Sequence, residues 1–287
     1  MESTMGQRFN IEFCGQSDTG RVRSHNEDSI EIDPGSGLAV LADGMGGYNA
    51  GEVASKLAVR SVGFLVRQRL ARLDPSVSPD SATPAPAGIL LQQAVQLANQ
   101  RILKTASTRA EYRGMGTTMI AALFVTDRVY VAHVGDSRLY RFRCDRLERL
   151  TIDHSLQEEL IARGMFSADE VKRLGKSNVV TRALGVEPNV DVTLGQHDMQ
   201  ADDLFLLCSD GLHDSLSEAD ILANLRRFMP ELPRLTRALI QAANARGGKD
   251  NISVILGHVR AASVASAEPS WWRRLLRRKT SQNNKKP

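Results

Sequence analysis

Four apolar runs of this chain each lie beside an aspartate that has one or two glycines within three residues of it, and this repetition constrains the fold more than any other feature. The runs are LAVLADG with Asp43 and Gly44, YVAHVGD with Asp136, LFLLCSDG with Asp210, and GGKDNISVI with Asp250. Short apolar runs predict buried strands, but aspartate is disfavoured in strands and costly to bury without a partner. A turn explains any single Asp-Gly pair. Four together predict strands that deliver carboxylates to one place.

Oxygen ligands without a cysteine or histidine cluster favour Mg²⁺ or Mn²⁺ over Zn²⁺. Converging carboxylates repel one another unless dications neutralise them. Two such ions, about 3.5–4 Å apart, can clamp an in-line displacement at phosphorus and convert a bridging water to hydroxide near neutral pH. Glycine after Asp43 would let the Gly44 carbonyl approach a metal without obstruction by a side chain.

A polar segment, SDTGRVRSHNED at residues 17–28, supplies a second group of candidates. Arg23 has the planar guanidinium that holds a phosphate through two parallel hydrogen bonds; the alternative is an ordinary surface cation. Three acids of the same segment are candidates for holding metal-bound water. They are Asp18, Glu27 and Asp28.

The periodicity of the rest predicts α+β layering, with two antiparallel sheets packed together and helices outside. Strands are expected within residues 8–41, at 190–199, 203–211 and 251–260, and as an antiparallel meander over 117–150. Helices are expected over 50–73, 89–107, 215–228 and 232–248, with Ser217 as an N-cap. Residues 74–88, rich in Pro, Ser and Ala, are expected to form a surface loop.

The basic character of the chain belongs to its C-terminal segment. The net charge is +4, but seven Lys or Arg residues and no acid lie between Ser270 and Pro287, so the remainder carries −3. Nucleic-acid binding would rest on this segment alone, and no nucleic acid is expected as a partner. Three cysteines without C-x-x-C spacing, and no apolar leader or membrane-length run, favour a cytoplasmic protein.

Eight motifs match, in order and at similar spacing, those of the metal-dependent Ser/Thr protein phosphatases of type 2C, the PPM family. They are SDTGRVRSHNED, LADGMGG, GMGTT, HVGDSRLY, LTIDHS, VVTRALG, LLCSDGLHD and GGKDNISVI. The chain resembles the compact bacterial branch over residues 8–260. The resemblance implies a four-layer α-β-β-α sandwich, two antiparallel sheets flanked by helix pairs. It also implies hydrolysis of phosphoserine and phosphothreonine by a hydroxide that bridges two divalent ions, Mn²⁺ or Mg²⁺.

The resemblance also implies roles for single residues. Asp43 resembles the aspartate that bridges both ions, with the Gly44 carbonyl on the second ion, while Asp210 and Asp250 resemble ligands of the first. Asp136 resembles a ligand of a third, weaker ion. Arg23 resembles the phosphate-binding arginine. Glu27 and Asp28, together with Asn251 after the last ligand, fall at positions that organise the metal centre and its water. The segment from Asp153 to Arg182 corresponds to a flap beside the active site.

One position departs from many relatives. Met45 stands two residues after Asp43, where eukaryotic members carry a histidine proposed to protonate the leaving group. Either a metal-bound water or another histidine would donate that proton. The sequence does not rank the candidates, which are His25, His133, His154 and His213.

The same sequence argues against several other functions. No cysteine has C-x₅-R spacing and no G-x-x-x-x-G-K-[ST] loop is present, which argues against cysteine-based phosphatases and P-loop enzymes. A regulatory pseudo-enzyme would be favoured by loss of the aspartates, but all four are present. Expected partners are phosphorylated proteins, including a Ser/Thr kinase, and a monomer is the default.

Residues 261–287 are expected to be a linker and a basic segment, WWRRLLRRKTSQNNKKP, that is either disordered or interfacial. Tryptophan suits the headgroup zone of a bilayer, and each Lys or Arg near an anionic surface adds about 1 kcal/mol. A weak contact between a membrane surface and residues 271–286 is therefore one hypothesis, and solvated disorder is the other.

Overall fold

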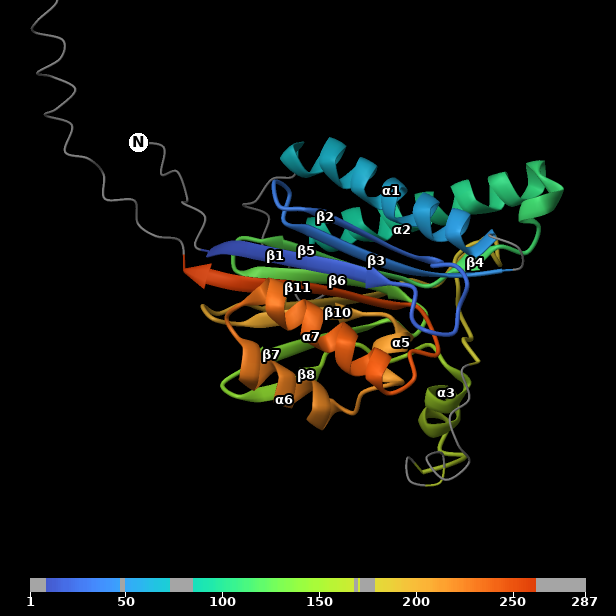
Figure 1. Ribbon diagram of the computed structural model, residues 1–287. Coiled ribbons are helices and arrows are strands. Elements are labelled where there is room, and N and C mark those ends of the chain that lie inside the picture. The colour runs from blue at the N-terminus through green and yellow to red at the C-terminus, as the bar shows by residue number, and fades with distance from the viewer. Residues whose placement is uncertain (1–8, 47–49, 73–84, 168–169, 171–178, 262–287) are drawn as a thin grey trace, which may run out of the picture.

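The computed structural model describes residues 9–46, 50–72, 85–167, 170 and 179–261. Its strands form two antiparallel sheets that pack face to face (Figure 1). The first sheet has the order β1 (Phe9–Asp18), β11 (Ile252–Ala261), β10 (Leu204–Cys208), β7 (Arg138–Arg143) and β8 (Arg146–Arg149). The second has the order β2 (Asp28–Asp33), β3 (Leu38–Met45), β5 (Met119–Val125), β6 (Arg128–Val134) and β9 (Thr193–Asp198), and β4 (Gly116–Thr117) pairs with β3.

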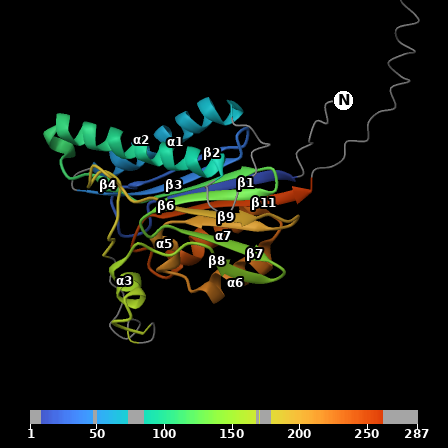
Figure 2. The same cartoon turned by 180° about the vertical axis from the view of Figure 1, so that it is seen from behind.

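A pair of helices covers the outer face of each sheet. The helices α1 (Ala50–Arg69) and α2 (Pro86–Thr108) lie on the second sheet, and α6 (Glu218–Phe228) and α7 (Leu232–Ala245) lie on the first (Figures 1 and 2). Two short helices, α3 (Leu156–Ala162) and α5 (Asp210–His213), and two 3₁₀ turns, Leu70–Arg72 and Ala110–Tyr112, complete the described elements. The predicted four-layer α-β-β-α sandwich is confirmed.

The central runs of β3 and β10 are apolar at every position because both of their faces are covered. Along β3, Leu38 and Val40 pack in the cluster under α1 and α2, whereas Ala39 and Leu41 pack in the cluster between the sheets. β10 follows the same rule, since its odd and even residues join different clusters. This double burial explains why LAVLA and LFLLC contain no polar residue.

The predicted helices form close to their expected bounds, and the predicted N-cap of α6 is confirmed. Ser217 caps α6, and its hydroxyl and the Asp220 side chain form a reciprocal capping box.

The meander predicted over residues 117–150 is wrong in one respect. β5 and β6 form a hairpin in the second sheet, but β7 and β8 form theirs in the first, so the chain changes sheet between Val134 and Arg138.

The chain makes this change of sheet at one end of the sandwich, where loops from both sheets meet. The end of β3, the turn after β6 and the start of α5 all lie there, with α3 projecting beyond them (Figure 1). Among the residues that the structure describes, no helix is long and apolar enough to cross a membrane.

Candidate metal centre

Asp43 lies inside β3, and the strand, which was expected to end on this carboxylate, continues for two more residues to Met45. Its cross-strand partner is Asp28, the first residue of β2. Two carboxylates opposite each other in an antiparallel pair are destabilising unless something compensates their charge. Both aspartates nevertheless belong to one face of the sheet at the loop-rich end of the sandwich.

The first sheet supplies two further strand-end aspartates. Asp210 begins α5, two residues after β10 ends, and Asp250 lies two residues before β11 begins. Asp136 follows β6 by two residues in the turn that crosses between the sheets. Four segments that are far apart in the sequence therefore bring their aspartates to one end of the fold.

The buried aspartates of this cluster lie close enough to raise one another's pKa values. Burial raises the pKa of Asp43 well above its ordinary value, and Asp28, Asp210, Asp136 and Asp250 raise it further. Burial, with a contribution from Asp210, likewise raises the pKa of Asp28 to about 7 and that of Asp136 to about 6. Burial and the charge of Asp250 raise the pKa of Asp210. Without a cation, charge on this cluster is unfavourable.

The donors fit a divalent metal by their chemistry. One carboxylate oxygen of Asp210 and one of Asp28 are buried without a hydrogen-bond partner, and such oxygens are expected to have a ligand. All of the converging groups are hard oxygen donors, which suits Mn²⁺ or Mg²⁺. Within the described ranges, no group of three or more His, Cys, Asp or Glu side chains is already arranged to hold a metal ion.

Gly44 has no room for a side chain. A Cβ atom there would lie 2.2 Å from the Gly51 carbonyl oxygen and 2.6 Å from the Glu27 carbonyl oxygen. Its amide donates to the same Glu27 oxygen at 3.2 Å. The missing side chain therefore lets the end of β3, the start of α1 and the segment before β2 pack together beside Asp43.

Arg23 is placed at the rim of the cluster. Its guanidinium donates to a carboxylate oxygen of Asp250 at 2.7 Å, while about half of the side chain, 53%, stays exposed. This hydrogen bond, with the charge of Asp250, raises the pKa of Arg23. Burial raises the pKa of Glu27, and the charge of Arg23 partly offsets that rise. A fixed cation thus stands where an anion approaching the aspartates would meet it.

The remaining predicted residues build the loop that holds Arg23. The Asn251 side chain accepts from the Glu27 amide at 2.8 Å and donates to the carbonyls of Thr19 and His25 at 2.9 Å. Asp18 accepts from the Gly20 amide at 2.9 Å and from the Asn244 side chain at 3.0 Å. The structure shows Asp18 in loop contacts, so any effect on metal-bound water would be indirect.

Sequence reasoning missed three positioning residues. The Ser209 hydroxyl donates to Asp28 at 2.8 Å, the Thr118 hydroxyl accepts from the Asp43 amide at 3.1 Å, and the Thr117 hydroxyl donates to the Asp43 carbonyl at 2.8 Å. The only available signal was their place in the motifs LCSDG and GMGTT, because serine and threonine are too common to stand out.

The structure distinguishes among the histidines. His133 and His154 are buried and stacked on each other, with ring centroids 4.7 Å apart. The His213 ring donates to the Asp136 backbone carbonyl at 3.2 Å. His25 is exposed. Each of the three buried rings is thus engaged in holding the backbone, and no general acid is assigned.

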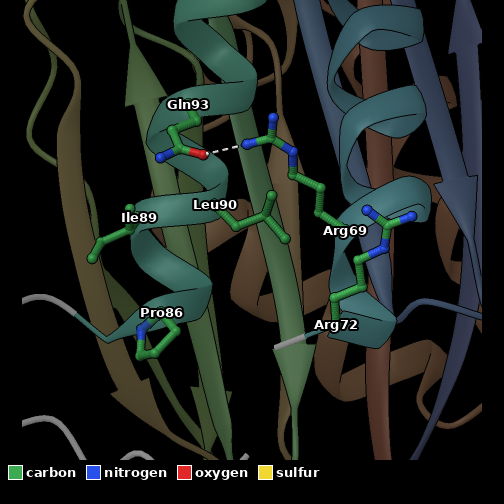
Figure 3. A pocket seen from close by; sticks show the side chains of 6 residues that line it. All are labelled: Arg69, Arg72, Pro86, Ile89, Leu90 and Gln93. Carbon is green, nitrogen blue, oxygen red and sulfur yellow. Dashed lines mark hydrogen bonds between the residues drawn. The ribbon is translucent and has the colours of Figure 1, made fainter. Parts of the chain in front are cut away.

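A separate pocket of about 450 Å³ lies between the last turn of α1 and the first turns of α2 (Figure 3). It is lined by Arg69, Arg72, Pro86, Ile89, Leu90 and Gln93, and Arg69 donates to Gln93 at 2.9 Å. The start of α1 contacts Gly44, and a helix of 20 residues spans about 30 Å. The pocket is therefore remote from the aspartates.

The comparisons with known proteins agree with this arrangement. The sequence model described as Protein phosphatase 2C matches residues 17–256. The chain therefore belongs to the protein phosphatase 2C family, a class of metal-dependent protein serine/threonine phosphatases. It is 36% identical over 244 residues to the serine/threonine phosphatase stp of Listeria innocua, which covers 84% of this chain and 93% of that protein.

Solved structures show the same fold. The serine/threonine phosphatase PstP/Ppp of Mycobacterium tuberculosis superposes with a TM-score of 0.76 at 34% identity, covering 87% of this chain and 99% of that chain. The catalytic domain of PstP in complex with two manganese ions superposes with a TM-score of 0.74 at 34% identity, covering 88% and 99%.

Proposed function

We propose that this protein hydrolyses phosphoserine and phosphothreonine on proteins with Mn²⁺ or Mg²⁺ held by Asp43, the Gly44 carbonyl, Asp210 and Asp250, and a third, weaker ion held with Asp136. The observation that carries the proposal is the convergence of four aspartates from separate segments at one end of a type 2C fold, where Asp136, Asp210 and Asp250 each raise the pKa of Asp43. The PstP complex with two manganese ions supports the choice of metal.

The ions, when bound, supply the charge that neutralises the phosphate and activates the attacking water. The chain orients the reaction through its own contacts. Asp28 is fixed by Ser209, and the backbone of Asp43 is fixed by Thr117 and Thr118. We propose that Arg23 binds the phosphate, and that Glu27, Asp28, Asn251 and, through its loop, Asp18 orient the water and ligands.

Metal removal tests the proposed function. Hydrolysis of p-nitrophenyl phosphate and of a phosphothreonine peptide is expected to stop after chelation and to return on addition of Mn²⁺. Without cations the aspartates would repel the dianionic phosphate. Colorimetric assay before and after dialysis against chelator measures this. Full activity after thorough metal removal would contradict the proposal, and binding of phosphopeptide without turnover in Mn²⁺ would support the pseudo-enzyme instead.

Replacement of Arg23 tests the phosphate contact. Arg23→Ala is expected to raise KM for a phosphothreonine peptide by about tenfold or more, because a hydrogen bond to a charged group contributes about 1.5–3 kcal/mol. Arg23→Lys should restore KM only in part, because an ammonium group cannot form the bidentate pair of hydrogen bonds that a guanidinium forms with a phosphate. Arg260→Ala is the matched control, because Arg260 pairs with Glu12 on an exposed strand end. Equal KM values for Arg23→Ala and Arg260→Ala would exclude the assignment.

We propose that the physiological substrates are phosphorylated proteins. Among them we expect a Ser/Thr protein kinase, whose own phosphorylated loop would be dephosphorylated. The test compares the phosphorylation level of each protein in cells with and without this enzyme. An unchanged phosphorylation level of the kinase would argue against the kinase as a substrate. The flap predicted between Asp153 and Arg182 lies partly outside the described residues.

The cellular location, the bounds of the catalytic domain and the oligomeric state are proposed from the sequence alone. We propose a cytoplasmic, monomeric enzyme whose catalytic domain spans residues 8–260. The basic segment at 271–286 lies outside the described residues, so its contact with an anionic membrane is proposed from composition alone. The full chain, but not a version ending at Arg260, should then sediment with anionic vesicles at low salt.

A further inference from the structure

His154 joins two parts of the active-site end that are otherwise separate. Its backbone amide donates to the Gly135 carbonyl at 2.9 Å, and the Gly135 amide donates back to the His154 Nδ1 atom at 3.1 Å. His154 also precedes the flap root, defined here as Ser155, Val180 and Thr181. Ser155 and Val180 form a β-bridge, and the Thr181 amide donates to the His154 carbonyl at 2.8 Å.

These contacts determine where the ring proton lies. A backbone amide can only donate a hydrogen bond, so Nδ1 must be unprotonated and the neutral ring must carry its proton on Nε2. Nε2 stands 2.9 Å from the Thr193 hydroxyl on β9, which accepts that proton. Burial, assisted by His133 and Arg182, lowers the pKa of His154 to about 4, so the neutral ring prevails at neutral pH. With both nitrogens engaged, His154 has no proton to offer a leaving group.

The turn that His154 holds carries Asp136. Gly135 has a φ of +104°, and a Cβ atom there would lie 2.6 Å from the Thr118 side chain. The turn is therefore pressed against Thr118, whose hydroxyl also accepts from the Asp43 amide. On the other side, His213 donates to the Asp136 carbonyl. His154 thus holds the peptide before Asp136, and His213 holds the peptide after it.

We propose that His154 is a positioning residue: its unprotonated Nδ1 fixes the Gly135–Asp136 turn, and its backbone ties that turn to the flap root. One residue then positions both the turn that carries Asp136 and the base of the segment beside the substrate. This rests on the proposed function, in which Asp136 binds the weakest of the metal ions.

Two substitutions separate the Nδ1 contact from the rest of the ring. The side-chain oxygen of asparagine is attached to Cγ, as Nδ1 is, so His154→Asn keeps an acceptor for the Gly135 amide. The amide of glutamine is one bond further out, where Nε2 lies, so His154→Gln keeps a partner for Thr193 but leaves Gly135 without an acceptor. His133→Gln is the control, because His133 is the stacked, buried neighbour and its Nε2 atom donates to the Ile152 carbonyl, away from Gly135.

Two measurements on the full chain are used: titration of Mn²⁺ binding, and hydrogen exchange of the Gly135 amide. His154→Gln should weaken binding of the weakest Mn²⁺ by about tenfold, the lower range for residues that orient metal ligands, and accelerate Gly135 exchange by about tenfold. His154→Asn and His133→Gln should leave both quantities the same as in the unmodified chain. Equal behaviour of His154→Gln and His154→Asn, or of His154→Gln and His133→Gln, would overturn the proposal.

Should His154→Gln fail to fold, Thr193→Val decides. It removes the acceptor that keeps the proton on Nε2, so the same two quantities should change in the same direction by about threefold; no change would overturn the proposal. Asp136→Asn separates this result from failure of the proposed function. If Asp136→Asn leaves all Mn²⁺ binding intact, the metal role of Asp136 is lost, while Gly135 exchange still tests the His154 contact.

Discussion

Asp210→Asn is expected to lower kcat by about 1,000-fold, equivalent to about 4 kcal/mol of lost transition-state stabilisation. The substitution preserves the size of the side chain at the start of α5 but removes one of the charges that would hold the metal ions. Metal-titrated steady-state kinetics with a phosphothreonine peptide measures the loss.

The same variant should be no less stable than the unmodified chain in the absence of metal. Burial and neighbouring carboxylates already make ionised Asp210 unfavourable, so removing its charge relieves repulsion. Thermal unfolding in chelator provides this check and excludes misfolding as the cause of inactivity. Asp127→Asn is the control, because Asp127 lies in the exposed β5–β6 turn. A folded Asp210→Asn enzyme with more than about a tenth of the activity would contradict the ligand assignment.

Gly44→Ala is expected to destabilise the fold by about 3 kcal/mol and to remove activity as well. The added Cβ would fall 2.2 Å from the Gly51 carbonyl oxygen and 2.6 Å from the Glu27 carbonyl oxygen. Both obstacles are backbone atoms, so no change of rotamer relieves the clash. The strand would have to shift, and Asp43 would move with it.

Denaturant unfolding of Gly44→Ala, beside Gly88→Ala, measures this effect. Gly88 lies in α2 with only Tyr130 at 4.0 Å from an added Cβ, so alanine there should be neutral or stabilising by up to about 1 kcal/mol. If both variants unfold at the same denaturant concentration, the close packing described around Gly44 does not limit stability.

The sequence predicted the strands best where both of their faces are buried. Runs such as LAVLA admit few alternatives, because a surface strand would show polar residues at every second position. The change of sheet after Val134 could not be predicted in this way. Local hydrophobicity is the same for a hairpin and for a crossing, so a single sequence does not distinguish the two.

The site shows the same division. Residue type and motif spacing were enough to select the aspartates and Arg23, and the structure brings them to one end of the sandwich. The residues that hold them were not predictable, because Ser209 contacts Asp28 across 181 positions and Thr118 contacts Asp43 across 75. Such polar pairs leave no periodic trace in a single sequence.

The pairing of β1 with β11 has a practical consequence. The two strands run antiparallel over their full lengths, from Asp18 opposite Ile252 near the aspartates to Phe9 opposite Ala261. Ten residues of strand span about 33 Å. A reporter, surface anchor or affinity handle fused at Phe9 or Ala261 would therefore project from the rear of the enzyme, and joining these two points should yield a circular permutant whose reaction site stays open to large protein substrates.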